Sequence, residues 1–418
     1  MKQTIAEKIL SAHCHKRLKA KDAAVCAVDF CFSQDGTSEL VIDSLRSLGK
    51  KKVFDPKKFC ITIDHSAPSP RQAISNIHQK LRDFSQKQGT LLFDVGCGVC
   101  HQVIPEAGLV LPGNLVVGAD SHTCTYGALN ALACGLGSTD IAVTLASGKN
   151  WFRVPETVKI IVRGKLPAGL TAKDIILWII GKVGANGCTY KAVEFIGPAI
   201  EQLEMDGRLT ISNMAVEMGA KCALFLADAK TLNWLKRRTK KSLRPVAPDE
   251  DAVYEEIKEF DVSKLSPQIA KPHSVDNAAN IEEVAGTKID VAFLGTCTNG
   301  RYADLEAACR ILKGRQVKPG VTMVVAPASR DIYLQAVKTG LTEIFSLAGA
   351  IILPPGCGPC VGTHGGVPAD AQNVVSTANR NFKGRMGNPL ASIFLASPLT
   401  VAASAVEGKL ADPRKYLV

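Results

Sequence analysis

Residues 350–362 read Ala-Ile-Ile-Leu-Pro-Pro-Gly-Cys-Gly-Pro-Cys-Val-Gly, with the two cysteines at positions 357 and 360. Residues 350–353 have the length and the β-branched content of a buried parallel strand. The CxxC loop that follows has a stiff backbone with few side chains, so two thiolates can point at one metal while nearby amides donate hydrogen bonds to the sulfurs. We therefore predict a metal-binding loop at the end of a strand.

The same arrangement of a short apolar run followed by polar or small residues recurs along the chain. Helix-like segments separate the runs, and each run ends near Gly, Pro, Asp or Cys. This alternation is typical of doubly wound α/β layers, in which chemistry gathers in loops at the carboxyl ends of the strands. We predict an α/β fold with strands at residues 59–63, 90–93, 115–118, 158–162, 290–294, 322–326 and 350–353.

The length of 418 residues is enough for several domains, each with its own core. Two candidate domain boundaries interrupt the pattern of strands and helices. One lies near Pro155, after a glycine-rich segment, and the other lies within residues 242–288, which are rich in Pro, Asp and Glu. We expect three α/β domains, at residues 1–155, 156–275 and 276–418.

The composition excludes several classes of protein. Hydrophobic residues make up 46% and charged residues 21% of the chain, which fits a globular enzyme and not a disordered or fibrous protein. Residues 1–10 lack the apolar core of a signal peptide, and the apolar run 25–32 is too short to span a bilayer. We therefore expect a cytoplasmic protein without membrane association, whose fourteen cysteines are thiols or metal ligands.

The net charge of +11 fits either an anionic partner or a lysine-rich solvated surface. The densest basic cluster, at residues 236–241, lacks interleaved aromatic residues and precedes a segment rich in proline and acidic residues. We do not expect nucleic-acid binding there.

A CxxC pair cannot complete a metal site alone. Cys297, in the segment Gly-Thr-Cys-Thr-Asn-Gly at residues 295–300, follows a predicted strand and is the best third ligand. Three cysteines without an obvious fourth indicate a [4Fe–4S] cluster with one iron free of protein ligands, because structural zinc would use four. Cys97 and Cys100 form a second CxxC pair, and spacing alone does not exclude them as the metal ligands. The alternative interpretation of this second pair is a tight turn from a strand into a helix.

Histidines and carboxylates follow three of the predicted strands or lie near them. An adjacent carboxylate can orient an imidazole and raise its pKa, which prepares the ring for proton transfer near neutral pH. A single pair of this kind is more often a structural hydrogen bond, but three sets in a chain with eight histidines favour an acid–base site. The candidates are Asp64, His65, His101, Asp120, His122 and Glu217, with Ser121 and Asn213 beside them.

Two arginines lie five residues apart in the segment 379–385, around Phe382 and Gly384. The guanidinium groups of Arg380 and Arg385 can bind separate carboxylates, or one can hold a substrate while the other orders the loop. Arginines in a flexible surface loop are the alternative.

These motifs together resemble the aconitase superfamily over nearly the whole chain, and most closely the short large subunits of isopropylmalate isomerases and homoaconitases. The resemblance is carried by Cys297 in its Gly-x-Cys-Thr-Asn context, Gly-Cys-Gly-Pro-Cys at 356–360, Ala-Asp-Ser-His-Thr at 119–123 and Asn-Arg-Asn-Phe at 379–382.

The resemblance implies a role for each candidate residue. It implies that Cys297, Cys357 and Cys360 hold the cluster, which leaves Cys97 and Cys100 without a metal role. The implied catalytic pairs are His65 with Asp64, His101 with Asp120, and His122 with Glu217. The implied substrate contacts are Gln34, Ser121, Asn213, Asn379, Arg380 and Arg385, with the two asparagines near the open iron.

The resemblance also implies an activity and a partner. The expected reaction is the isomerisation of 2-isopropylmalate and 3-isopropylmalate by loss and regain of water, in leucine biosynthesis. Homoaconitase, citraconate hydratase, 2,3-dimethylmalate dehydratase and RNA binding by a cluster-free form are alternatives. The implied architecture has three α/β/α domains and lacks the fourth, swivelling domain. A small subunit would supply that domain in a heterodimer or heterotetramer that acts on a hydroxy di- or tricarboxylate.

Overall fold

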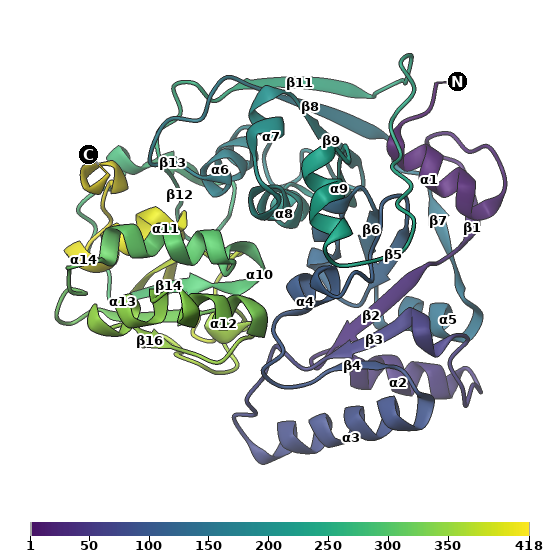
Figure 1. The fold of residues 1–418 in the computed structure, drawn as a ribbon, viewed down its shortest axis with the longest axis horizontal. Helices are drawn as coiled ribbons and strands as arrows, with labels where there is room; N and C mark the ends of the chain where they lie inside the picture. The colour runs from purple at the N-terminus through teal and green to yellow at the C-terminus, as the bar shows by residue number, and fades with distance from the viewer. Residues whose placement is uncertain (1, 418) are drawn as a thin grey trace.

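The computed structural model describes residues 2–417, in which three sheets have parallel cores (Figure 1). The first sheet has five parallel strands in the order β4-β3-β2-β5-β6. Its strands are β2 (Phe30–Gln34), β3 (Phe59–Thr62), β4 (Leu91–Phe93), β5 (Leu115–Gly118) and β6 (Leu132–Gly135). The helices in this part of the chain are α1 (Ile5–Cys14), α2 (Ser38–Ser47), η1 (Pro56–Lys58), α3 (Gln72–Gln88), α4 (Cys100–Glu106), η2 (Ser121–Leu129) and α5 (Ser138–Ser147). A separate antiparallel ribbon pairs β1 (Ala23–Ala27) with β7 (Lys149–Arg153).

The second sheet has four parallel strands in the order β10-β9-β8-β11. The strands are β8 (Thr157–Arg163), β9 (Ala192–Ile196), β10 (Cys222–Phe225) and β11 (Glu256–Asp261). The helices are α6 (Ala172–Val183), α7 (Pro198–Gln202), α8 (Met205–Met214), η3 (Ala215–Met218) and α9 (Ala229–Lys236).

The third sheet has seven strands in the order β13-β12-β18-β17-β14-β15-β16, and β12 pairs antiparallel with both of its neighbours, β13 and β18. The strands are β12 (Gln268–Ala270), β13 (Ala278–Asn280), β14 (Val291–Gly295), β15 (Thr322–Ala326), β16 (Ile351–Ile352), β17 (Asn373–Ser376) and β18 (Ser392–Leu395). The helices are η4 (Ile281–Glu283), α10 (Thr296–Asn299), α11 (Tyr302–Leu312), α12 (Arg330–Lys338), α13 (Leu341–Leu347), η5 (Gly358–Val361), α14 (Pro398–Glu407) and η6 (Pro413–Tyr416).

Local sequence explains why these elements form and where they begin. β14 is buried along its whole length, as expected for a parallel strand covered by helices on both faces. The helix α6 begins with a capping box: the Thr171 hydroxyl accepts the Lys173 N–H, and Asp174 accepts the Thr171 N–H. A cap of this kind stabilises a helix by about 1 kcal/mol.

The predicted α/β fold class is confirmed, but one strand differs from its prediction. The sequence predicts a buried strand at residues 350–353, whereas β16 has two residues and forms an edge of the third sheet, with Ile351 53% exposed. A strand's place within its sheet depends on distant pairing and not on its own apolar residues. Each expected domain contains most of one sheet; the expected limit at 275/276 falls between the paired strands β12 and β13, and the domain limits stay a prediction.

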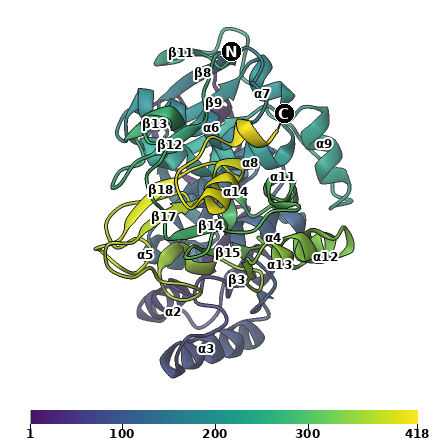
Figure 2. The same cartoon turned by 90° about the vertical axis from the view of Figure 1, so that its left-hand side faces the viewer.

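The arrangement of the sheets directs several strand ends toward one place. In Figures 1 and 2 the second sheet lies at one end of the molecule and α3 of the first sheet at the other. The third sheet lies to the left in Figure 1 and faces the viewer in Figure 2. The helix α4 contacts both η2 and α10, so it joins the first sheet to the third. None of the helices within residues 2–417 combines the length and the apolarity needed to cross a membrane.

Candidate active site

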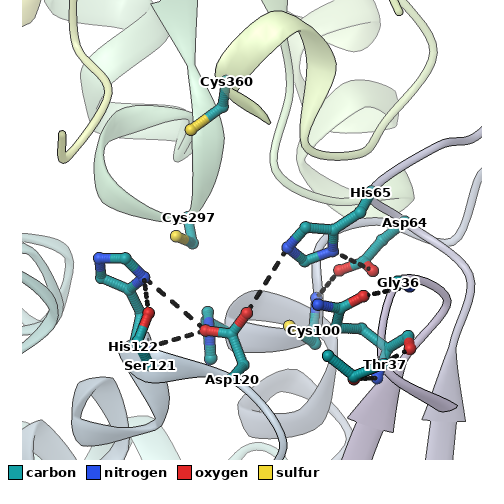
Figure 3. Close-up of polar contacts among 12 residues, drawn as sticks. Gly36, Thr37, Asp64, His65, Cys100, Asp120, Ser121, His122, Cys297 and Cys360 are labelled. Atoms are coloured by element: carbon teal, nitrogen blue, oxygen red, sulfur yellow. Dashed lines mark hydrogen bonds and ion pairs between the residues drawn. The ribbon is translucent and has the colours of Figure 1, made fainter. Parts of the chain in front are cut away.

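Asp120 lies just beyond β5 and is the centre of the polar network. Its Oδ1 accepts hydrogen bonds from His101 Nε2 and from the His122 N–H, both at 2.8 Å, and its Oδ2 lies 3.6 Å from His65 Nε2 (Figure 3). The three histidines come from the loop after β3, from α4 and from η2. One carboxylate therefore joins three segments that are distant in the sequence.

His65 is held in its charged form. Its Nδ1 donates to Asp64 Oδ1 at 2.8 Å, and the other oxygen of Asp64 accepts the Cys100 N–H at 2.7 Å, at the start of α4. Both ring nitrogens of His65 face carboxylates, which only accept, so the ring carries two protons. Burial opposes this charge, but Asp64 and Asp120 outweigh burial and raise the pKa of His65 well above its usual value.

His101 is held in its neutral form, although it shares Asp120 with His65. Its Nε2 donates to Asp120, while its Nδ1 is buried without a hydrogen-bond partner among the described residues. Burial is the largest influence on this ring and lowers the pKa of His101. Two imidazoles on one carboxylate thus differ in charge, which is how a site separates an acid from a base.

The third histidine connects the network to an arginine. His122 Nε2 donates to Glu217 Oε1 at 2.8 Å, and Arg380 Nε donates to the same oxygen at 2.8 Å. Arg380 also donates to the Ser121 hydroxyl at 3.0 Å. Burial opposes the charge of Glu217, but His122 and Arg380 lower the pKa of this carboxyl.

The three candidate cysteines lie opposite this network. Cys297 is in α10, directly after β14, and Cys357 and Cys360 flank the first turn of η5. All three are buried. They line one cavity of about 130 Å³ together with polar and apolar side chains, namely Gln34, His65, Val99, His101, Asp120, Ser121, His122, Val361, Asn379 and Arg385.

Several N–H groups point at the cysteine sulfurs. Asn213 Nδ2 donates to Cys297 Sγ at 3.2 Å, Asn379 Nδ2 lies 3.6 Å from the same sulfur, and Arg385 donates to Cys360 Sγ at 3.3 Å. Hydrogen bonds of this kind favour a thiolate over a thiol. The sequence predicts that Arg385 binds or positions substrate carboxylate; the structure places its guanidinium on a cysteine sulfur at the cavity wall.

The spacing of the sulfurs bears on the kind of metal group they could hold. Within residues 2–417, one group of three histidine, cysteine or carboxylate side chains has its ligand atoms within 4.8 Å of one another, namely Asp35, Asp64 and His65. The sulfurs of Cys297, Cys357 and Cys360 therefore do not all lie within 4.8 Å of one another. Thiolates on one zinc ion lie about 3.8 Å apart, given Zn–S bonds of ~2.3 Å. At least one pair of these sulfurs therefore lies farther apart than two thiolates on one zinc ion.

The second CxxC pair does not face the cavity. Cys97 and Cys100 are absent from its lining. The Val99 N–H donates to the Ala328 carbonyl and Gly98 bridges to Ser329, so this segment is a turn into α4 that docks on the third sheet. Two larger cavities, of about 650 and 640 Å³, have neither histidine nor cysteine in their linings.

Sequence reasoning missed three charged residues around the site. Asp35, after β2, accepts the N–H groups of residues 64, 65 and 66. Arg301 is fully buried and donates to the carbonyls of Cys297 and Thr298 and to Gln102. Lys173 is fully buried and donates to the carbonyls of Thr377 and Ala378, just before Asn379. Asp35 and Arg301 stand next to recognised motifs; for Lys173 the sequence offers no signal beyond a charge in an apolar helix.

A family model described as the aconitase family (aconitate hydratase) matches residues 7–287 and 280–408 of the chain. The 3-isopropylmalate dehydratase large subunit 2 of Archaeoglobus fulgidus is 52% identical over 419 residues, and the large subunit 1 of Thermotoga maritima is 50% identical over 420 residues; both alignments cover 100% of each chain. A probable methanogen homoaconitase large subunit of Methanothermobacter thermautotrophicus is 45% identical over 99% of this chain and 98% of its own.

Among solved structures, aconitase X of Thermococcus kodakaraensis in its holo-form has a similar fold. It matches with a TM-score of 0.50 and 14% identity over 85% of this chain and 84% of its own. This likeness concerns the fold alone.

Proposed function

The chain belongs to the aconitase family, and from this premise we propose that it is the large subunit of a 3-isopropylmalate dehydratase, a hydro-lyase of leucine biosynthesis. Relatives that bear this name match the chain along its whole length at about half identity. The observation that carries the proposal is one cavity lined on one side by carboxylate-paired histidines and on the other by three buried cysteines.

The cysteines fit the iron–sulfur cluster that the family implies. Cys297, Cys357 and Cys360 would hold a [4Fe–4S] cluster, since all three are buried around one cavity and their sulfurs receive N–H groups from Asn213 and Arg385. No fourth cysteine among residues 2–417 lines the cavity. When bound, the cluster would offer an iron without a protein ligand, which acts as a Lewis acid toward a hydroxyl and a carboxylate of the substrate.

His65 is the proton donor of the proposed reaction. Its Nδ1–H stays with Asp64, so the proton that faces the cavity is the one on Nε2. During dehydration this proton passes to the leaving hydroxyl, and during rehydration the same nitrogen takes a proton from the incoming water. Asp64 and Asp120 keep the ring oriented in both directions.

The other polar groups bind and orient the hydroxy acid. Arg380 is positioned by Glu217 and Ser121, and about a quarter of its side chain is exposed, so its guanidinium can donate hydrogen bonds to a substrate carboxylate. Gln34 and Ser121 line the cavity and supply hydrogen bonds to the substrate. The base that removes the carbon-bound proton would come from a small subunit. The name "large subunit" of the relatives supports the existence of such a partner.

The test is an assay of the reconstituted complex. The chain, loaded with iron and sulfide without oxygen and mixed with its small subunit, should interconvert 2-isopropylmalate and 3-isopropylmalate, and the chain alone should not. A kcat/KM for homocitrate above that for 2-isopropylmalate would assign the chain to the homoaconitases instead. Turnover of neither hydroxy acid by a fully loaded complex would contradict the proposed function.

A further inference from the structure

We propose that Asp35, supported by His78, is a positioning residue for the proton donor His65: its carboxylate fixes the main chain of residues 64–66. This inference rests on the proposed function for its catalytic consequence. Asp35 follows β2 and is 5% exposed. Its Oδ1 accepts the N–H groups of Asp64 at 3.2 Å and His65 at 2.8 Å, and its Oδ2 accepts the N–H of Ser66 at 2.8 Å.

Three consecutive N–H groups on one carboxylate leave this segment little freedom. All three N–H groups donate to a carboxylate that is itself buried at the end of β2. Without Asp35, three buried donors would lose their acceptor, and the loop would have to move to satisfy them. His65 would move with it, because its ring position follows from its own backbone and from Asp64.

The carboxylate of Asp35 also contacts a buried histidine on α3. His78, on α3, is 2% exposed and its Nε2 lies 3.4 Å from Asp35 Oδ2. Burial opposes the charge of Asp35, but His78, His65 and the loop N–H groups lower the pKa of this carboxyl. Asp35 is thus an anion that the first sheet keeps in place.

The carbonyl groups of the same segment are held from the opposite side. The Asp64 carbonyl accepts the Cys357 N–H at 2.9 Å, and the His65 carbonyl accepts the Thr363 hydroxyl at 2.8 Å. The main chain around His65 is therefore fixed between Asp35 of the first sheet and the cysteine loop of the third. Figure 3 shows His65 between the turn at Gly36, which follows Asp35, and the wall that carries Cys360.

A cation site would also bring Asp35, Asp64 and His65 together, but the carboxylate oxygens already accept N–H groups. Both oxygens of Asp35 accept N–H groups, and the two oxygens of Asp64 accept His65 Nδ1 and the Cys100 N–H. His65 Nδ1 donates and so cannot bind a metal. Positioning explains these contacts and a metal does not.

The chain offers a matched control at the other end of the same strand. Asp29 precedes β2 and accepts His13 Nε2 at 2.7 Å and the Leu115 N–H at 2.9 Å. Like Asp35 it accepts hydrogen bonds from one histidine and from the main chain, although 35% of its side chain is exposed, and its partners lie outside residues 64–66. D35N and D29N make the same chemical change at the two ends of β2.

The experiment measures turnover and amide hydrogen exchange in both variants. In the cluster-loaded complex, D35N should lower kcat by ~10–100-fold with KM within ~3-fold of wild type, as expected for a donor misplaced by less than an ångström or so. D29N should keep kcat within ~2-fold, and both should retain the wild-type iron content and visible spectrum. In the metal-free full chain, D35N should speed exchange of the amides of residues 64–66, and D29N should not.

Amide hydrogen exchange does not depend on the substrate, so it tests the positioning of residues 64–66 separately from the proposed dehydratase function. Fast exchange in D35N with no turnover of isopropylmalate by wild type would uphold the positioning of the loop and reject the proposed function. Unchanged exchange at 64–66, or equal loss of kcat in D35N and D29N, would overturn the positioning role. If D35N does not fold, H78L removes only the support behind Asp35; faster exchange and lower kcat would uphold the proposal, and wild-type values of both would overturn it.

Discussion

On the side of the cavity built by the loops after β3 and β5, each histidine has a carboxylate partner, and Asp120 lies within reach of all three. On the side built by α10 and η5, three cysteines are buried, and their sulfurs receive hydrogen bonds from an amide of Asn213 and from the guanidinium of Arg385. Burial raises the pKa of Cys297 to about 11, so this thiol keeps its proton near pH 7 until a metal replaces it.

The comparison teaches that the protein prepares the two sides differently. The acid–base side has its charges and proton positions set by hydrogen bonds within the chain. The cysteine side is not uniform: burial raises the pKa of Cys297, whereas the Cys357 thiol and the Arg385 guanidinium hold the pKa of Cys360 well below its usual value. A bound metal group would replace the remaining thiol protons. Substitutions on the two sides should therefore differ in their effects on the visible spectrum of the loaded protein and on its turnover.

The largest effect is expected on the cysteine side. C357S should abolish the visible absorbance of the reconstituted protein and lower turnover by at least ~10³-fold, because a serine hydroxyl is a poor ligand for an iron–sulfur cluster. C97S, in the second CxxC pair outside the cavity, is the control and should keep both properties. Measured iron and sulfide content with a turnover assay checks both variants; a colourless but fully active C357S would reject the cluster ligands.

A smaller effect, of another kind, is expected on the acid–base side. H65A should lower kcat by ~10²–10⁴-fold, as loss of a general acid does, while the visible spectrum stays that of wild type. H13A removes the partner of Asp29 outside the cavity and should leave kcat unchanged. Wild-type turnover by H65A would remove His65 from the reaction, and a lost spectrum would show that the two sides are not independent.

The sequence predicted the parts of both sides that follow from strand order. Carboxyl ends of parallel strands meet at one edge of a sheet, so Asp64 and Asp120 could be grouped before any contact was known. Cys297 could be placed at the end of a strand, but that strand belongs to the third sheet. The CxxC loop at 357–360 was distinctive enough to stand alone. Most of the α/β layering followed from the alternation of apolar runs with helix-like segments.

What the sequence did not predict depends on tertiary contacts. Asp35, in Ser33-Gln34-Asp35-Gly36, has the sequence signature of a turn residue, and its role appears only when residues 64–66 pack over it. The exposed edge position of β16 and the contact of Arg385 with a sulfur are likewise set by distant neighbours. Local patterns place a residue on an element but do not say what approaches it.

The smallest effect concerns a buried charge behind the cysteine side. On the acid–base side the buried imidazolium of His65 has carboxylate partners, whereas Lys173 Nζ donates to the carbonyls of Thr377 and Ala378. Burial lowers the pKa of Lys173 to about 7, although Asp304, Cys360, Cys297 and Asp174 favour its charge. The two sides therefore also differ in how a buried cation is compensated.

The pH dependence of stability tests this difference in the metal-free chain. The pKa of Lys173 is about 7 when folded and near 10.5 when unfolded, so between these values the unfolded chain holds more protons and folding gains stability as pH rises. The free energy of unfolding of wild type relative to K173M should thus increase by about 2 kcal/mol from pH 7.5 to 9, at ~1.4 kcal/mol per pH unit. Urea unfolding of both proteins at several pH values measures the slope. Taking the difference between wild type and K173M removes the contributions of titrating groups that the two proteins share. Parallel curves would show that the lysine stays charged in the folded chain, and that the cysteine side compensates a buried cation as fully as the acid–base side does.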